Sequence, residues 1–219
     1  MHFFNAWRHF CSFQVPNLSN PFRPNTVSTV HLLIVSLASP FFVIVMCEAI
    51  VFMSSEGTNK LRKFFHSATS IYLEYLASYT VTTFAMEAMK CAFARLRPHY
   101  LSANCTGTDM HRIRVGRQSF PSGHSAAAAL LFTFLYFYLK GLTDATGSKL
   151  LRVIRAVLLS VVGMWAALVM TTRVTDHWHH PSDVLGGILL AAACIYIPVR
   201  RTHSSLVFKK RMLNNAHSA

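Results

Sequence analysis

The stretch Arg173-Val-Thr-Asp-His-Trp-His-His-Pro-Ser-Asp183, between two long apolar runs, gives the strongest indication of how this chain is organised. It holds three histidines, two aspartates and one arginine within eleven residues. Ionisable side chains this dense are unfavourable at the edge of a lipid bilayer unless they line a hydrated cavity or bind a ligand. We therefore interpret the rest of the chain as a membrane frame that holds this cluster against other polar segments.

The composition predicts an all-α fold, a multi-pass transmembrane helical bundle. Of the 219 residues, 53% are apolar and 13% are charged, and the mean hydropathy is +0.36, which is unusual for a soluble domain. Five segments are predicted to span the bilayer: Val30 to Phe52, Ile71 to Leu96, Ser125 to Leu139, Leu150 to Thr171 and Val184 to Val199. They divide the chain into an N-terminal segment (1–29), a transmembrane domain (30–200) and a basic tail (201–219).

The net charge of +13 is distributed unevenly along the chain. The links after the first and third predicted spans, and the tail, are rich in lysine and arginine, which places them in the cytoplasm. The links 97–124 and 172–183 then face the outside or a lumen, as do the predicted glycosylation sites Asn17 and Asn104. The expected partners of this charge are anionic head groups and phosphate esters, and not nucleic acid, because no nucleic-acid-binding module is recognisable.

Three polar clusters fall at span ends on this outer side, and the first contains Lys90 and Arg97. Seven residues of a helix turn through about 700°, which predicts that the two cations share a face, about 10 Å apart along the axis. Pro98 disfavours helical geometry at Arg97 and marks the end of the span. The alternative for Lys90 is a structural ion pair with Glu87, three residues earlier.

The second cluster is Phe120-Pro-Ser-Gly-His124, directly before the third span. A helix start leaves backbone N–H groups free, and Gly123 lets an anion approach the backbone closely. Ser122 and Gly123 therefore read as a phosphate cradle with His124 beside it. The alternative is an ordinary helix cap with a solvated histidine.

The third cluster is the stretch quoted first. His179 and Asp183 are four residues apart, so on a helix the carboxylate is expected to reach a ring nitrogen and fix the tautomer. Arg173 adds a guanidinium suited to bidentate phosphate contact. The alternatives are a hydrated interfacial loop and a metal site built from His177, His179, His180 and Asp183. Nearby cations would repel a divalent ion and attract phosphate, so we expect no metal.

Together the clusters supply what phosphoryl transfer requires: fixed positive charge, an uncharged histidine nucleophile and a second histidine as proton donor. Lys90-x6-Arg97-Pro98, Pro121-Ser-Gly-His124 and Arg173-x5-His179-x3-Asp183 resemble, in order, the three signature motifs of the type 2 phosphatidic acid phosphatase superfamily. The flanking residues resemble its animal lipid phosphate phosphatase branch, and the resemblance covers nearly all of residues 20 to 200.

The resemblance implies an integral-membrane phosphoric monoester hydrolase that needs neither magnesium nor another cofactor. His179 would form a phosphohistidine, Asp183 would orient it, and His124 would protonate the leaving alkoxide and then activate water. The phosphate oxygens would be held by Lys90, Arg97, Ser122, Gly123 and Arg173. The implied substrates are phosphatidate, lysophosphatidate, sphingosine 1-phosphate and ceramide 1-phosphate, at the outer or lumenal face of the plasma membrane, endoplasmic reticulum or Golgi.

The chain departs from the family pattern in one respect. The family has six spans and this sequence has five, so we expect either that the first family span is missing, through a fragment or a shortened isoform, or that the N-terminus is translocated. A catalytically weak lipid-binding protein is therefore the main alternative function, and a transporter is disfavoured because the charges gather at one membrane edge. The sequence leaves open the preferred lipid, a homo-oligomeric state, and a disulfide between Cys11 and Cys105.

Overall fold

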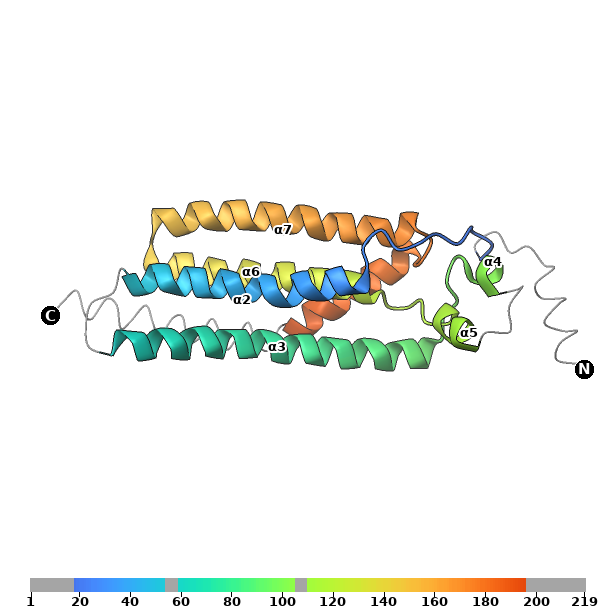
Figure 1. Cartoon of the computed structure of the whole chain (residues 1–219), viewed down its shortest axis with the longest axis horizontal. Helices are drawn as coiled ribbons and strands as arrows, with labels where there is room; N and C mark the ends of the chain where they lie inside the picture. Colours follow the sequence, from blue (N-terminus) through green and yellow to red (C-terminus); the bar gives the residue numbers. More distant parts are fainter. Residues whose placement is uncertain (1–17, 54–58, 105–109, 196–219) are drawn as a thin grey trace, which may run out of the picture.

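The computed structural model describes residues 18–53, 59–104 and 110–195. Within these ranges the chain is helical and contains no strand, which agrees with the predicted all-α class. Its long helices, side by side in Figure 1, are α2 (Thr29–Met53), α3 (Lys60–Phe93), α6 (Gly123–Thr146) and α7 (Lys149–Thr175). The short helices α4 (Tyr100–Asn104) and α5 (Met110–Gly116) lie at one end, and a last described helix, Pro181–Ile195, runs back from the end of α7.

Helix α6 is the centre of the bundle, because it packs against α2, α3 and α7. In its most apolar stretch 67% of the residues are buried, against 11% in α7. Its first turns carry Ala126 to Ala129, whose small side chains let neighbouring helices approach closely. Larger buried side chains follow and fill the core between the helices: Leu130, Leu131, Phe134, Leu135, Tyr138, Leu139 and Leu142.

Each predicted span coincides with a helix over the residues that the structure describes, although the bounds differ, and residues 196–199 of the fifth span lie outside those residues. Helices α2, α6 and α7 are long and apolar enough to cross a membrane on their own. Helix α3 is the longest at 34 residues, and its charged side chains make it less apolar than the other three. It nevertheless packs against both α2 and α6, so it belongs to the same bundle.

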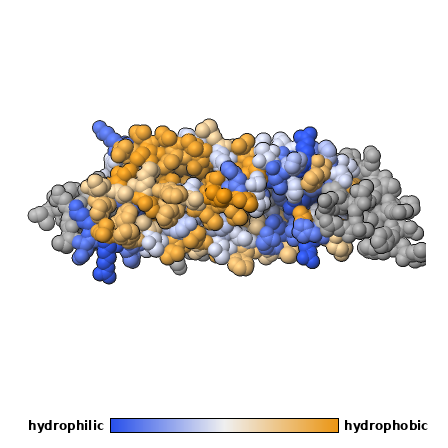
Figure 2. Space-filling model, in the orientation of Figure 1, coloured by the Kyte–Doolittle hydropathy of each residue, from blue (hydrophilic) through white to orange (hydrophobic). Residues whose placement is uncertain are grey.

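The outer surface fits a lipid environment. Figure 2 shows hydrophobic residues over much of the helical shafts, with hydrophilic residues gathered toward the two ends. On α7 the exposed side chains recur at intervals of three and four residues, which aligns them along one face: Val153, Val157, Val161, Met164 and Leu168. Such a face is stable in hydrocarbon and would be unfavourable in water.

The turn between α6 and α7 sets how these helices meet. Gly147 ends α6 in the left-handed region, with φ 66°, and Ser148 caps α7 by accepting a hydrogen bond from Leu151 N. This tight turn makes the two helices antiparallel neighbours. The last turn of α7 therefore returns to the level of the first turn of α6, and the polar residues at these two helix ends come together.

Candidate active site

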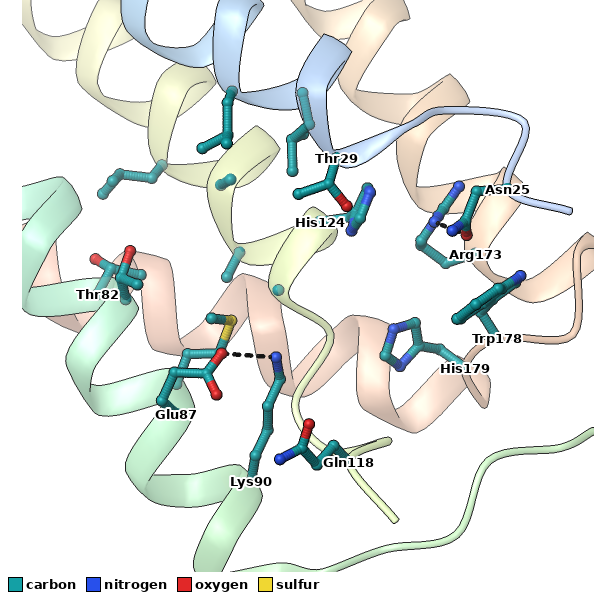
Figure 3. A pocket seen from close by; sticks show the side chains of 18 of the residues that line it. Asn25, Thr29, Thr82, Glu87, Lys90, Gln118, His124, Arg173, Trp178 and His179 are labelled. Carbon is teal, nitrogen blue, oxygen red and sulfur yellow. Dashed lines mark hydrogen bonds and ion pairs between the residues drawn. The ribbon is translucent and has the colours of Figure 1, made fainter. Parts of the chain in front are cut away.

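A cavity of about 540 Å³ lies where α3 and α7 end and α6 begins. One end of it is polar and is formed by Lys90, Arg97, Gln118, Gly123, His124, Arg173, Trp178 and His179. Figure 3 labels six of these residues, all except Arg97 and Gly123. The other end is mostly apolar and is formed by residues of α2, α3 and α6, including Leu32, Leu33, Tyr79, Met86, Ala126, Ala127 and Leu130. Of the eight residues predicted to form the catalytic and phosphate-binding site, six line this cavity, and Asp183 and Ser122 do not.

His179 follows the end of α7 and is almost completely buried. Its Nδ1 lies 2.7 Å from the Ser119 carbonyl oxygen, an acceptor only, so Nδ1 carries the proton and donates it. The second ring nitrogen, Nε2, is then unprotonated. Burial lowers the pKa of His179 well below its ordinary value, and Arg97 lowers it further, so the ring is neutral at pH 7. A neutral imidazole with a fixed tautomer is the form that a nucleophile requires.

Asp183 does not bond directly to His179, contrary to the expectation from their spacing. Its Oδ2 lies 3.9 Å from His179 Nδ1, which is too far for a hydrogen bond. The buried carboxylate instead accepts hydrogen bonds from Ser119 Oγ at 2.6 Å, from the His180 backbone N–H at 2.8 Å and from Arg95. Because the Ser119 carbonyl holds the His179 ring, Asp183 orients the histidine through Ser119.

His124 is the second residue of α6, and its ring faces the cavity from the side opposite α3 (Figure 3). Its Nε2 is buried and has no hydrogen-bond partner, whereas the ring contacts the Val27 backbone. A buried nitrogen without a partner is unfavourable unless a ligand supplies one. Its position at the rim of the cavity therefore suits a group that exchanges a proton with a bound substrate.

Arg97 lines the same cavity, but it lies on a loop and not on the helix predicted from the sequence. Helix α3 ends at Phe93 rather than at residue 96, and Ala94 takes a left-handed conformation with φ 43°. Arg97 is therefore on the loop that follows, where its backbone N–H donates to the Gly116 carbonyl at 2.9 Å. The prediction that Lys90 and Arg97 share a helix face is wrong, and the loop brings them together instead.

The Arg97 guanidinium is a buried cation with unused donors. The residue is 8% exposed, and its Nε and Nη1 have no hydrogen-bond partner. Its guanidinium carbon lies 4.6 Å from the centre of the Trp178 ring, which provides a cation–π contact. The Asp183 carboxylate raises the pKa of Arg97, but by less than burial lowers it, so the counter-charge is only partial. Burial lowers the pKa of Arg97 to about 10, and Arg173 contributes to the lowering, so the group stays charged at pH 7. An anion is the partner that these donors lack.

Lys90 and Gly123 meet at the polar end of the cavity. Lys90 Nζ is 2.9 Å from Glu87 Oε1, which is the ion pair foreseen as the alternative for this lysine. A Cβ atom on Gly123 would lie 2.4 Å from Met86 Sδ and 3.7 Å from Lys90 Nζ. A larger residue here would displace the end of the Met86 side chain and would reduce the space beside the lysine.

Ser122 has a different position from the one predicted. It is fully buried, does not line the cavity, and caps α6 by accepting a 3.4 Å hydrogen bond from Ser125 N. Its hydroxyl also contacts Ser125 Oγ at 3.0 Å. The cap prediction describes this residue better than the phosphate-cradle prediction, and Gly123 is the member of the pair that borders the cavity.

Arg173, in the last turn of α7, is held by the segment that precedes α2. It is 1% exposed, and its Nη1 donates to Asn25 Oδ1 at 2.8 Å. Its Nη2 lies 3.4 Å from the Val27 carbonyl oxygen and 3.5 Å from Asp176 Oδ2. Its Nε has no partner. The guanidinium is therefore fixed in place while one donor remains available.

Sequence reasoning missed the contribution of this segment, residues 20–28. The Thr26 backbone N–H and hydroxyl both donate to Asp176, at 2.8 and 2.9 Å, which ties the segment to the end of α7. Phe22 packs edge-on against His99, with ring centroids 5.3 Å apart. Asn25 itself lines the cavity. The segment has no helical periodicity and no charge pattern, and only the proximity of Asn25 to Arg173 in the fold reveals its role.

Replacing Asn25 by alanine should lower kcat/KM for a lipid phosphate about tenfold, because Arg173 loses the partner that orients it. Phosphate release by the purified variant measures this. Asn20→Ala is the matched control, since Asn20 lies in the same segment, does not line the cavity, and its side-chain amide donates to the Pro98 carbonyl at 3.4 Å. Equal losses in the two variants would contradict a specific role for Asn25.

Two other sequence predictions fall partly or wholly beyond the described structure. Asn17, Cys11 and Cys105 lie outside the described residues, as does the tail 201–219. Asn104 is the last residue of α4, and the position of its side chain is not described. The glycosylation sites and the disulfide remain predictions.

The metal-site alternative finds no geometric support in the described part of the chain. No group of three or more histidine, cysteine, aspartate or glutamate side chains there is arranged to hold a metal ion. The candidate ligands have separate partners: His177 Nδ1 lies near the Pro21 carbonyl, His179 near Ser119, and His180 near Asp183.

This chain is similar in sequence to a known protein family and to several of its members. The profile of the PAP2 superfamily matches residues 71–205. Similar proteins include a PA-phosphatase related-family protein of Dictyostelium discoideum (31% identical, 78% of this chain and 58% of the relative), phospholipid phosphatase 1 of Rattus norvegicus (26%, 87% and 73%) and lipid phosphate phosphatase 2 of Arabidopsis thaliana (29%, 80% and 61%). The chain thus spans less than two thirds of the Dictyostelium and Arabidopsis proteins, and no solved structure matches it. Because the matched region is more than half of the chain and holds both histidines and all three cations of the cavity, this chain belongs to the PAP2 superfamily.

Proposed function

We propose that this protein is a membrane lipid phosphate phosphatase, which hydrolyses phosphate monoesters such as phosphatidate, lysophosphatidate, sphingosine 1-phosphate and ceramide 1-phosphate. One observation carries the proposal. Buried, unpartnered nitrogen atoms of Arg97, Arg173 and His124 border the same cavity as His179, and the nearby Asp183 carboxylate offsets the charge of Arg97 only in part. A phosphate group would satisfy these donors and offset their charge.

In the first chemical step, the lone pair of His179 Nε2 attacks phosphorus. A P–N bond forms as the ester P–O bond breaks, and His124 donates a proton to the departing alkoxide, so that the lipid leaves as an alcohol. The arriving phosphate favours the protonated form of His124, because a negative charge now lies beside its ring. Arg97, Arg173 and Lys90 stabilise the charge that develops on the equatorial oxygens.

In the second step, His124 takes a proton from a water molecule, whose oxygen attacks phosphorus. The P–N bond breaks, which releases inorganic phosphate and restores neutral His179. Asp183 contributes through Ser119. The Ser119 carbonyl accepts a hydrogen bond from His179 Nδ1–H and keeps the ring in one orientation in both steps. In this scheme every charge that contacts the phosphoryl group belongs to a side chain.

The apolar end of the cavity supports a lipid as the alcohol. Leu32 and Leu33 of α2 face residues of α3 and α6 there, and the cavity continues from the polar end without interruption. A phosphate held by the cations would thus leave its chain among apolar side chains, where burial is favourable.

The charge pattern supports an active site on the outer or lumenal face. The cavity lies at one end of the bundle. The basic residues Lys60, Arg62 and Lys63 at the start of α3, and Lys140 and Lys149 around the turn from α6 to α7, lie at the opposite end. If those basic ends are cytoplasmic, the cavity opens toward the outside or a lumen. The plasma membrane, endoplasmic reticulum and Golgi all fit this orientation.

The proposal predicts phosphate release that does not depend on divalent cations. Membranes or detergent micelles with the purified full chain should release inorganic phosphate from lysophosphatidate at the same rate with and without excess EDTA. The physical reason is that arginine and lysine side chains, and not Mg²⁺, neutralise the transition state. Loss of activity on chelation would contradict the mechanism, and absence of release from all four lipids would favour a lipid-binding role instead.

A further inference from the structure

Glu87 places a negative charge in a cavity whose other charged or basic side chains are arginine, lysine and histidine. It is the one acidic side chain among the described residues that line the cavity, and it is 50% exposed. A carboxylate beside an anion site weakens the binding of phosphate through charge repulsion. Its ion pair with Lys90 only partly offsets this, because the pair also diverts a cation from the substrate. A carboxylate at this place therefore suggests a second polar group on the substrate.

The position of Glu87 along α3 indicates which part of a substrate it would meet. The lining positions on α3 recur at intervals of three and four residues along one face: Tyr79, Thr82, Thr83, Met86, Glu87 and Lys90. From Lys90 to Tyr79 this face is about 16 Å long. Lys90 lies at the phosphate end, and the first turn toward the apolar end carries Glu87. Figure 3 shows Glu87 and Lys90 next to each other on α3. In a lipid whose phosphate lies beside Lys90, the atoms that immediately follow the phosphate ester would pass this carboxylate.

The hydrogen-bonding capacity of the pair leaves Glu87 able to contact a substrate. A lysine ammonium has three N–H donors, so Lys90 can hold Glu87 and a phosphate oxygen together. A carboxylate has two oxygens, and the 2.9 Å bond from Lys90 engages Oε1. The remaining oxygen can accept a hydrogen bond from a donor on the carbon next to the phosphate-bearing carbon. An ammonium at that carbon would contribute both a donor and an opposite charge.

We propose that Glu87 is a specificity-determining residue, which favours lipid phosphates with a free ammonium on the carbon next to the phosphate-bearing carbon over those with a neutral amide or ester there. Sphingoid-base phosphates are the substrate class with this chemistry. The inference rests on the proposed phosphatase function. It concerns the relative rates of substrates and leaves the chemical steps unchanged.

The test compares two substrates that differ in this charge. Sphingosine 1-phosphate has the ammonium, and its N-acetyl derivative has a neutral amide in the same place. With the full chain in detergent micelles, Glu87→Gln should lower the ratio of kcat/KM for the amine over kcat/KM for the amide about fivefold, as expected for a partly exposed ion pair. The substitution keeps the size and shape of the side chain, so folding should be preserved.

Asp144→Asn is the matched control variant. Asp144 also pairs with a lysine at helical spacing, with 3.3 Å between Asp144 Oδ2 and Lys140 Nζ, but it lies at the other end of α6. This variant should leave the ratio unchanged. If Glu87→Gln leaves this ratio unchanged, the specificity proposal is overturned. Equal slowing of both substrates would then mean that Glu87 acts only by positioning Lys90. A wild-type protein inactive on every lipid would instead refute the phosphatase proposal itself.

Discussion

Replacing His179 by alanine should lower phosphate release from lysophosphatidate by at least about 10³-fold, because the variant has no atom that can form the P–N bond. Two features of the structure suit this side chain to the proposed role. Its Nδ1–H donates a hydrogen bond to the Ser119 carbonyl, and burial keeps the ring neutral. The measurement is a phosphate-release assay on purified protein, combined with detection of a phosphohistidine after a rapid acid-free quench.

His31→Ala is a suitable control, since His31 is exposed on α2 and does not line the cavity. It should retain full activity and still form the phosphohistidine. Substantial activity in the His179 variant would show that another group attacks phosphorus, and the proposed mechanism would then fail. A folded variant without phosphohistidine and without activity agrees with it.

The fold class followed from the sequence because the bilayer imposes a simple rule. A chain segment that crosses hydrocarbon must satisfy its backbone within a helix, so long apolar runs predict helices wherever they occur. The five predicted spans all coincide with helices for this reason. The end of α3 was placed three residues too late, because Ala94 leaves the helix in a left-handed conformation that its residue type does not favour.

The candidate site was only partly predictable, and the reason is physical. Lys90, His124 and His179 could be identified from the sequence, because an ionisable side chain beside an apolar run is energetically unfavourable in a membrane and therefore indicates a function. The contacts of Asn25 and Ser119 join segments far apart in the sequence, so no local pattern indicates them. The link between Asp183 and His179 was expected to be direct, because helical spacing brings the two close. It runs instead through a loop that the spacing rule does not describe.

Arg97→Met should have opposite effects on catalysis and on stability. Activity should fall about 10²- to 10³-fold, since a buried donor to the transition state is lost. The melting temperature of the ligand-free protein should rise, with a gain in unfolding free energy of about 1 kcal/mol, because a buried cation that Asp183 compensates only in part is replaced by an apolar side chain of similar length. The pKa lowered by burial to about 10 has the same cause: the folded protein holds this charge less favourably than water does.

Arg173→Met provides the contrast that makes this prediction decisive. Arg173 also contributes a donor to the cavity, so its loss should lower activity to a similar extent. Its guanidinium, however, donates to Asn25 and lies within 3.5 Å of Asp176, and both would lose a partner. The variant should therefore melt at a lower temperature, with a loss of roughly 1–3 kcal/mol. If both variants are destabilised, the free protein already stabilises the Arg97 cation without phosphate. Arg97 would then no longer support a phosphate site in this cavity.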